Sequence, residues 1–183
     1  MTVKTAKRGR PSQLNAERIV ECARALLAEQ GKIPSIRALS AALSVDPMAI
    51  YHYFPNKAAL LEAVCLALIE AIHRPAGPDW RTEIRALCLS YLTLLQAHPG
   101  LLDTLLSMDG SGPAQVFIAR YEQALQPLAL PQPVLNDSRD LLVDYLHGYA
   151  LAMQTSQGKL DLSYLDGPLA FWTRALQREA DAH

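Results

Sequence analysis

The sequence predicts an all-α protein in two parts, and three observations carry this prediction. Apolar residues recur at spacings of three and four along nearly the whole chain, as they do in amphipathic helices. Prolines, glycines and helix-capping residues separate these stretches. The charge is also divided: residues 1–57 hold nine Lys and Arg against four Asp and Glu, whereas residues 58–183 hold eight against fourteen. We therefore expect a basic three-helix head followed by an acidic helical domain.

The head opens with a basic arm and a first helix. The helix is predicted from Asn15 to about Gln30, and Gly31 can end it in the left-handed conformation that glycine accepts readily. The arm, predicted over residues 1–14, contains no acidic residue. A flexible basic arm of this kind suits phosphates or a minor groove.

Residues 35–57 predict two short helices around a tight turn. Ser35 can cap the first helix, and Asp46 can cap the second, with Pro47 at its first position. Ile50 and Phe54 are four residues apart, so they should anchor the second helix inward on one face. The other side chains of this helix must then face solvent or a partner.

The exit of the second short helix favours a bound phosphate. Pro55 stops that helix, and Asn56 can cap a further helix that holds Lys57 in its first turn. The helix dipole disfavours a cation there, whereas a phosphate would bind both the lysine and the free backbone N–H groups. Two short helices around a tight turn, with a basic arm, are typical of helix-turn-helix proteins that read the DNA major groove. DNA binding is therefore the expected function of the head.

Residues 15 to about 70 resemble the DNA-binding region of the TetR family of bacterial transcriptional regulators. The resemblance lies in the segments NAERIVECARALLAEQG, SIRALSAAL, MAIYHYF and PNKAALLEAV, and in the RGRP sequence of the arm. It implies a one-component regulator, and we expect a repressor that binds double-stranded DNA at an inverted repeat as a homodimer. An effector could bind more tightly to a conformation in which the two heads are wrongly spaced for the operator. It would then weaken DNA binding by the difference between its binding free energies for the two conformations.

The resemblance also assigns roles to single residues. Pro47, Met48 and Ala49 correspond to positions that face base edges, and Tyr51 and Lys57 to phosphate contacts. The complete set of residues expected to contact DNA is Lys7, Arg8, Arg10, Ser35, Arg37, Pro47, Met48, Ala49, Tyr51, His52, Tyr53, Asn56 and Lys57.

Two positions depart from the family pattern. Ser44 stands where a turn glycine is usual and must accept a conformation that favours glycine, and Tyr53 stands where histidine is common. Neither change removes a donor that faces phosphate, so DNA binding should survive. Met48 and Ala49 offer apolar contacts that suit thymine methyl groups, which leaves Arg37 as the strong candidate for guanine recognition.

Beyond these motifs the chain predicts further helices and two proline-rich breaks. The break at residues 74–78 is the expected domain boundary, with a DNA-binding domain over 15–74 and an effector-binding and dimerisation domain over 75–183. Residues 127–133 form the second break. The predicted helices are 56–73, 79–98, 101–108, 113–126, 137–157 and 168–181.

The last two helices are too apolar for a free surface. Residues 141–153 carry apolar side chains nearly all round, so one side should pack on the core and another on a second subunit. The resemblance implies the same arrangement, a four-helix bundle formed with a partner chain. The residues expected at this homodimer interface are Gly148, Ala152, Leu169, Trp172 and Leu176.

A pocket for a small effector is expected among the helices of the second domain. Its lining should be mainly apolar, with tyrosine and histidine as the few orienting polar groups, so the effector should be lipophilic or aromatic. The candidate residues are Tyr91, Leu95, Leu102, Met108, Phe117, Tyr121, His147 and Tyr149. The same spacing also suits an ordinary core, and this alternative stays open.

Composition and motifs argue against a membrane protein, a metalloprotein and an enzyme. Half of the residues are hydrophobic and 19% are charged, which is typical of a globular chain. Without a signal peptide or an apolar stretch near about eighteen residues, the expectation is a cytoplasmic protein that does not enter a membrane. The five scattered histidines have no metal-ligand spacing, so we expect no metal, cofactor or enzymatic activity. A head repurposed for protein interaction and an all-α enzyme remain as alternatives.

Overall fold

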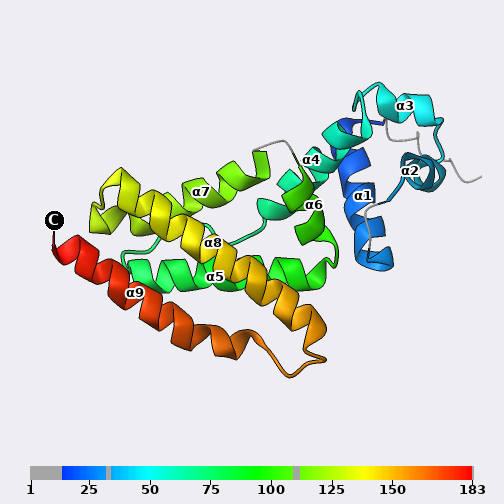
Figure 1. Cartoon of the computed structure of the whole chain (residues 1–183). Helices are drawn as coiled ribbons and strands as arrows, with labels where there is room; N and C mark the ends of the chain where they lie inside the picture. Colours follow the sequence, from blue (N-terminus) through cyan, green and yellow to red (C-terminus); the bar gives the residue numbers. More distant parts are fainter. Residues whose placement is uncertain (1–13, 32–33, 109–111, 183) are drawn as a thin grey trace, which may run out of the picture.

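The regular elements are all helical across the part of the chain that the structure describes (Figure 1). The computed structural model describes residues 14–31, 34–108 and 112–182. The predicted all-α fold class is confirmed. In chain order the α-helices are α1 (Ala16–Gln30), α2 (Ile36–Leu43), α3 (Pro47–Tyr51), α4 (Lys57–Ile69), α5 (Trp80–Ala97), α6 (Leu101–Ser107), α7 (Gly112–Leu125), α8 (Gln132–Thr155) and α9 (Asp166–Asp181). Two short 3₁₀ turns, η1 (Gln126–Leu128) and η2 (Leu162–Leu165), precede α8 and α9.

Side-chain caps begin the four helices of the head. Each cap oxygen accepts a hydrogen bond from a backbone N–H of the first turn, over distances of 2.7 to 3.1 Å. The capping roles predicted for Ser35, Asp46 and Asn56 are confirmed. The caps are Asn15 for α1, Ser35 for α2, Asp46 for α3 and Asn56 for α4.

The turn between α2 and α3 has the predicted strain. Ser44 ends α2 with φ = 54°, in the left-handed region that favours glycine. Ile50 and Phe54 are buried, so they anchor α3 as expected from their spacing. The short helix is therefore fixed on its inner side and open on its outer side.

Helix α4 connects the head to the rest of the protein. It packs against α1 on one side and against α7 on the other. It ends at Ile69, whereas the sequence predicted an end near His73. The difference has a physical cause, because tight turns follow Ile69 and the carbonyl groups of Ile69, Glu70 and Ile72 accept hydrogen bonds from Arg120.

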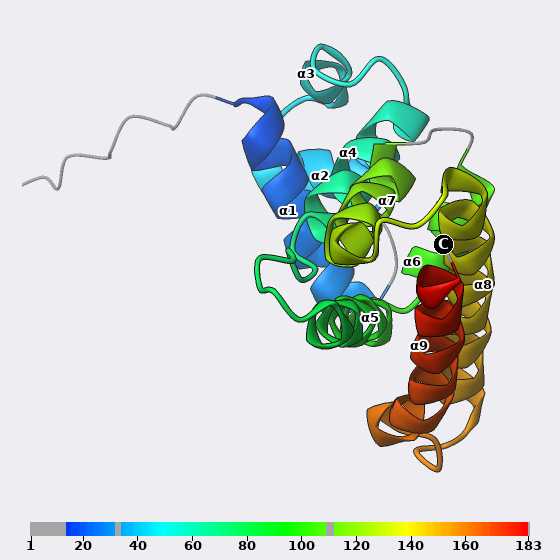
Figure 2. The same cartoon turned by 90° about the vertical axis from the view of Figure 1, so that its left-hand side faces the viewer.

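The second domain is built on α5, which packs against α7 and α8. Helix α8 begins at Gln132 rather than at residue 137, since prolines are tolerated in a first helical turn and Pro133 lies there. Helix α9 likewise begins two residues before its predicted start. Both views show α8 and α9 side by side along one edge of the molecule, away from α3 (Figures 1 and 2).

The helices that the structure describes include none with both the length and the apolar character required to cross a membrane.

Candidate DNA-binding and ligand-binding sites

The outer face of α3 is the candidate reading surface. Helix α3 lies at the extremity of the head in both views (Figures 1 and 2). Met48 is 71% exposed, and Tyr51 and His52 are also exposed on the side away from the buried Ile50. Ala49 is half-buried, so it can touch a partner only at close approach. This surface offers apolar and aromatic groups without a charge of its own.

The start of α4 supplies the cationic group beside this surface. Lys57 is the first residue of α4 and is exposed. The side-chain oxygen of Asn56 accepts the Ala59 N–H, so Asn56 serves as a cap and leaves other first-turn N–H groups of α4 unbonded within the helix. An anion bound here would meet both the lysine and the positive end of the helix dipole.

Tyr53 has a structural contact that the sequence did not reveal. Its hydroxyl donates a hydrogen bond to the carbonyl of Leu14 over 2.6 Å, and its ring meets the edge of His52 at a centroid distance of 5.3 Å. Tyr53 thereby ties the exit of α3 to the residue that precedes the α1 cap. The position that departs from the family pattern thus links the exit of α3 to the start of α1.

The other predicted DNA contacts fall in three places. Arg37 and the α2 cap Ser35 are exposed at the start of α2, and Pro47 is the exposed first residue of α3. The Ser35 hydroxyl accepts the Ala38 N–H, as a cap does. The arm residues Lys7, Arg8 and Arg10 lie outside the described part of the chain.

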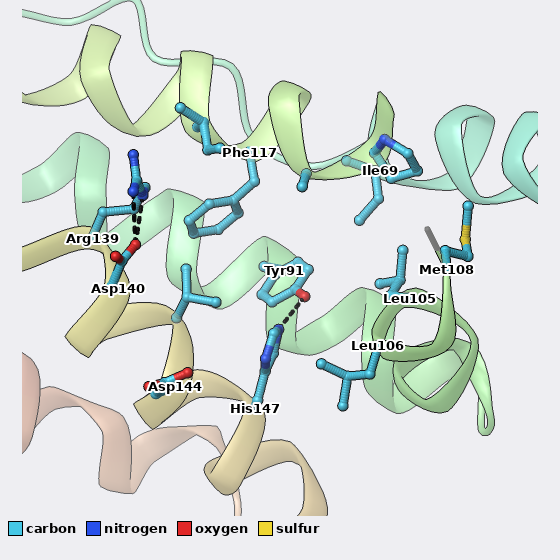
Figure 3. A pocket seen from close by; sticks show the side chains of 14 residues that line it. Ile69, Tyr91, Leu105, Leu106, Met108, Phe117, Arg139, Asp140, Asp144 and His147 are labelled. Carbon is cyan, nitrogen blue, oxygen red and sulfur yellow. Dashed lines mark hydrogen bonds and ion pairs between the residues drawn. The ribbon is translucent and has the colours of Figure 1, made fainter. Parts of the chain in front are cut away.

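A cavity of about 350 Å³ lies in the second domain, between α5, α6, α7 and α8 and against the end of α4 (Figure 3). Its wall is mainly apolar on the α6 and α7 side, and α8 contributes the charged residues. The lining residues are Ile69, Tyr91, Leu105, Leu106, Met108, Pro113, Ala114, Phe117, Ile118, Arg139, Asp140, Val143, Asp144 and His147.

The structure brings four of the eight predicted pocket residues together around this cavity: Tyr91, Met108, Phe117 and His147. The other four are absent from the lining of this cavity. Leu95 and Leu102 are buried in the core. The hydroxyl of Tyr121 pairs with Ser138 Oγ at 2.7 Å, and that of Tyr149 donates to the Asp161 carbonyl at 2.6 Å. These residues lie on helix faces that pack against other elements.

Tyr91 and His147 form a hydrogen-bonded pair inside the cavity. The tyrosine hydroxyl and His147 Nε2 are 2.8 Å apart, and the ring of Tyr91 also packs against Phe117 (Figure 3). Burial raises the pKa of Tyr91. Burial lowers the pKa of His147, and the nearby Asp144 carboxylate opposes part of this decrease. Both groups are therefore neutral at pH 7, and either atom can donate to the other.

Sequence reasoning missed the charged side of the cavity. Arg139 Nη2 and Asp140 Oδ1 form an ion pair at 2.8 Å, and Asp144 lies between this pair and His147 (Figure 3). The signal was present, because Asp140, Asp144 and His147 are spaced by four and three residues and so share one face of a helix. Polar residues on one face of an otherwise apolar helix indicate a wall that is not ordinary core.

The residues predicted at the homodimer interface fall into two groups on α8 and α9. Leu169, Trp172 and Leu176 are buried within the chain itself, and Trp172 Nε1 donates to the Ser138 carbonyl at 3.3 Å. Gly148 and Ala152 are exposed, and a Cβ built at Gly148 would meet nothing within 4 Å outside its own helical turn. The large exposed hydrophobic residues near this edge are Leu141, Leu151, Tyr164 and Phe171.

Among the described residues there is no group of three or more His, Cys, Asp or Glu side chains that could hold a metal ion.

The head matches the model of a known protein family. Residues 19–64 match the family model described as "Bacterial regulatory proteins, tetR family". The matched segment contains α2, α3 and most of α1 and α4, which are the elements of the helix-turn-helix head. The predicted resemblance of the head to the TetR family is therefore confirmed. No curated protein gives a significant sequence match to the chain.

Solved structures share the fold over 90% or more of the chain. Apo ActR from Streptomyces coelicolor superposes with a TM-score of 0.77 at 19% identity, over 93% of this chain and 98% of that one. BioQ in complex with its natural double-stranded DNA operator superposes with a TM-score of 0.72 at 20% identity, over 90% of this chain and 99% of that one. A single-residue variant of TetR from Acinetobacter baumannii AYE, in complex with minocycline, superposes with a TM-score of 0.66 at 22% identity, over 93% of this chain and 96% of that one. Over 90% or more of its length, the chain thus has the fold of these solved structures.

Proposed function

We propose that this protein is a one-component transcriptional repressor, which binds an inverted-repeat operator as a homodimer and is released by a small, largely apolar effector. The observation that carries the proposal is that one helix, α4, connects the head to the cavity of the second domain. The exposed helix-turn-helix head is joined by α4 to a domain whose cavity touches the last residue of that same helix, Ile69. A ligand in the cavity and DNA on the head therefore act on one element.

The head has the parts that DNA binding requires. Its exposed α3 can enter a major groove, and Lys57 with the start of α4 can hold a phosphate at the groove edge. Phosphate contacts give affinity for any sequence, whereas base contacts select one. Tyr51 and Lys57 are the residues we assign to affinity.

Sequence preference should come from an apolar surface. Met48 and Ala49 lack hydrogen-bonding side chains and suit thymine methyl groups, whereas the exposed Arg37 of α2 can pair with a guanine. If the Arg37→Ala variant weakens every sequence equally, Arg37 binds phosphate and reads no base.

Homodimerisation is supported by the uncovered edge of the second domain. Leu141, Leu151 and Phe171 are exposed by 65%, 45% and 70% on adjacent helices, which is unusual for large hydrophobic side chains on one edge. The exposed Gly148 and Ala152 of α8 permit close approach of a second helix. ActR, BioQ and the TetR variant share this fold. A C2 dimer would present two heads, which implies an inverted-repeat operator.

The cavity indicates the chemistry of the effector. An apolar body is favoured by the α6 and α7 walls, and the Tyr91–His147 pair can receive one hydroxyl or carbonyl group. Asp140 and Asp144 disfavour a carboxylate. ActR has been solved with actinorhodin and the TetR variant with minocycline, so small molecules bind to proteins of this fold.

The effector chemistry is tested with four naphthalene derivatives of one shape, by titration of the protein and measurement of bound fraction by fluorescence. We expect 2-naphthol to bind more tightly than 2-methylnaphthalene, because only the phenol meets the tyrosine–histidine pair. 2-Naphthoate should bind least, and 2-naphthylmethylammonium serves as the opposite-charge control. Tightest binding of the carboxylate, or no binding of the phenol, contradicts the proposed pocket chemistry.

The DNA function is tested by selecting bound fragments of the source genome with purified protein at near-physiological salt. An enriched inverted repeat is expected, and it should be lost in the Tyr51→Ala and Lys57→Ala variants. Lys159→Ala, which removes an exposed cation far from the head, is the matched control and should retain the enrichment. Uniform binding of all fragments, or none, would show that the head is nonspecific or serves another partner.

A further inference from the structure

The second domain holds a buried guanidinium. Arg120 in α7 is 5% exposed and is the one charged side chain that is buried among the described residues. Its Nη1 donates to the carbonyls of Ile69, at 3.3 Å, and Ile72, and its Nη2 donates to the carbonyl of Glu70 at 2.9 Å. All three acceptors belong to the end of α4 and the turns that follow it.

This contact satisfies a need of α4. The last carbonyl groups of a helix lack partners within it and form the negative end of its dipole, where a cation is stabilising. Helix α4 has no basic residue in its own last turn. Arg120 supplies the missing cation from a helix of the second domain and donates to three carbonyls at once.

The clamp, by which we mean Arg120 and its three carbonyl acceptors, shares components with the cavity. Ile69 gives its carbonyl to Arg120 and its side chain to the cavity wall. Phe117 lines the same cavity from α7, three residues before Arg120 and therefore on the same face (Figure 3). Because Ile69 belongs to both the clamp and the cavity wall, an occupant that displaces Ile69 from Phe117 acts on a carbonyl that the guanidinium binds.

The two helices also meet closely at the other end of α7. A Cβ added at Gly112 would lie 3.1 Å from Glu62 Oε1 of α4, which is tighter than ordinary contact. Helix α7 therefore lies against α4 near both of its ends, and a displacement at the cavity acts on the helix that carries the head.

We propose that Arg120 is the positioning residue that couples the cavity to the DNA-binding head, by holding the end of α4 against α7 until a ligand separates them. This inference rests on the proposed function and adds the residue through which the regulation acts. Without the guanidinium, α4 would no longer follow α7, so ligand binding would lose its effect on DNA affinity while both sites remain.

The test is the ratio of operator affinities with and without saturating 2-naphthol, on the operator obtained by the genomic selection. Coupling between two sites is about 5- to 150-fold in typical cases, and we expect a ratio in that range for the unmodified protein. Arg120→Met should bring it to within about twofold of unity. Arg85→Met is the matched control, since its exposed ion pair with Asp166 joins α5 to α9 away from α4, and it should keep the full ratio.

The outcomes separate coupling from simple stability. If Arg120→Met lowers the melting temperature but keeps the unmodified ratio, Arg120 is only structural and the inference is overturned. If that variant does not fold, Arg120→Lys retains the charge without the three-point contact and should show a reduced ratio; an unchanged ratio overturns the inference. An unmodified protein with no coupling refutes the proposed effector control itself.

A measurement without DNA further distinguishes a coupling role of Arg120 from a purely structural one. Hydrogen exchange of the amides at residues 69–73 should accelerate in the unmodified protein when 2-naphthol binds, because the clamp is disturbed. In the Arg120→Lys variant, exchange there should be fast already and respond less. Binding of 2-naphthol with no change in this segment would overturn the clamp while leaving the pocket intact.

Discussion

Replacement of Phe171 by alanine should weaken the homodimer strongly. Phe171 is 70% exposed in the single chain. Full burial of a phenylalanine side chain contributes about 1.5–3 kcal/mol, so covering its exposed part contributes about 1–2 kcal/mol in each protomer. A C2 interface uses each position twice, which gives a loss of about 2–4 kcal/mol and raises the dimer dissociation constant by about 30- to 700-fold.

The assay is sedimentation equilibrium over a range of protein concentrations, with the melting temperature recorded beside it. Met48→Ala is the matched control, because Met48 is 71% exposed but lies in α3, far from α8 and α9. The control should keep the dimer. Because Phe171 contributes little to its own protomer's core, its replacement should leave the monomer folded.

An unchanged dissociation constant for Phe171→Ala would refute the assignment of this edge as the interface. A monomeric unmodified protein at micromolar concentration would refute the homodimer altogether. Operator binding should fall with dimer stability, since two heads are needed for both half-sites.

Three further changes have expected results. Ser44→Gly should stabilise the protein by about 0.5–1 kcal/mol, because φ = 54° strains a non-glycine residue; a lower denaturation midpoint would contradict this. Tyr91→Phe should weaken 2-naphthol binding by about 1 kcal/mol, near fivefold, and leave 2-methylnaphthalene unaffected; equal losses for both ligands would show that the hydroxyl has no orienting role. Hydrogen bonds from His73 and from the Ala76 and Gly77 amides lower the pKa of Glu83, so its carboxylate stabilises the fold above its unfolded pKa, and this is lost as pH falls through the folded value. Glu83→Gln should therefore lower the melting temperature at pH 7 and converge with the unmodified protein in acid, whereas equal melting temperatures at pH 7 would exclude this role.

The parts of the fold that depend on local chemistry could be predicted from the sequence. The caps Ser35, Asp46 and Asn56 act within three residues of their own position, and the anchors Ile50 and Phe54 act through helical spacing. The strain at Ser44 was also foreseeable, because the turn requires a left-handed residue.

The parts that depend on distant contacts could not be predicted. Whether a side chain of α5 or α7 faces a cavity or a neighbouring helix is decided by packing, which is why Tyr121 is absent from the cavity lining although its spacing allowed it. Trp172 looked available to a partner but covers α8 of its own chain. Arg120 had a signal, because it falls on the buried stripe of α7 between Phe117 and Ala124, but its acceptors lie about fifty residues away.

DNA and effector should act on each other through α4, and the reciprocity of their two affinities tests this coupling most directly. The affinity for 2-naphthol should be measured by fluorescence titration with the free protein and with the protein saturated by its selected operator. Thermodynamic linkage requires the operator to weaken 2-naphthol binding by the same factor by which 2-naphthol weakens operator binding. Equal affinity of the free and the operator-bound protein for 2-naphthol would show that the cavity and the head are not coupled.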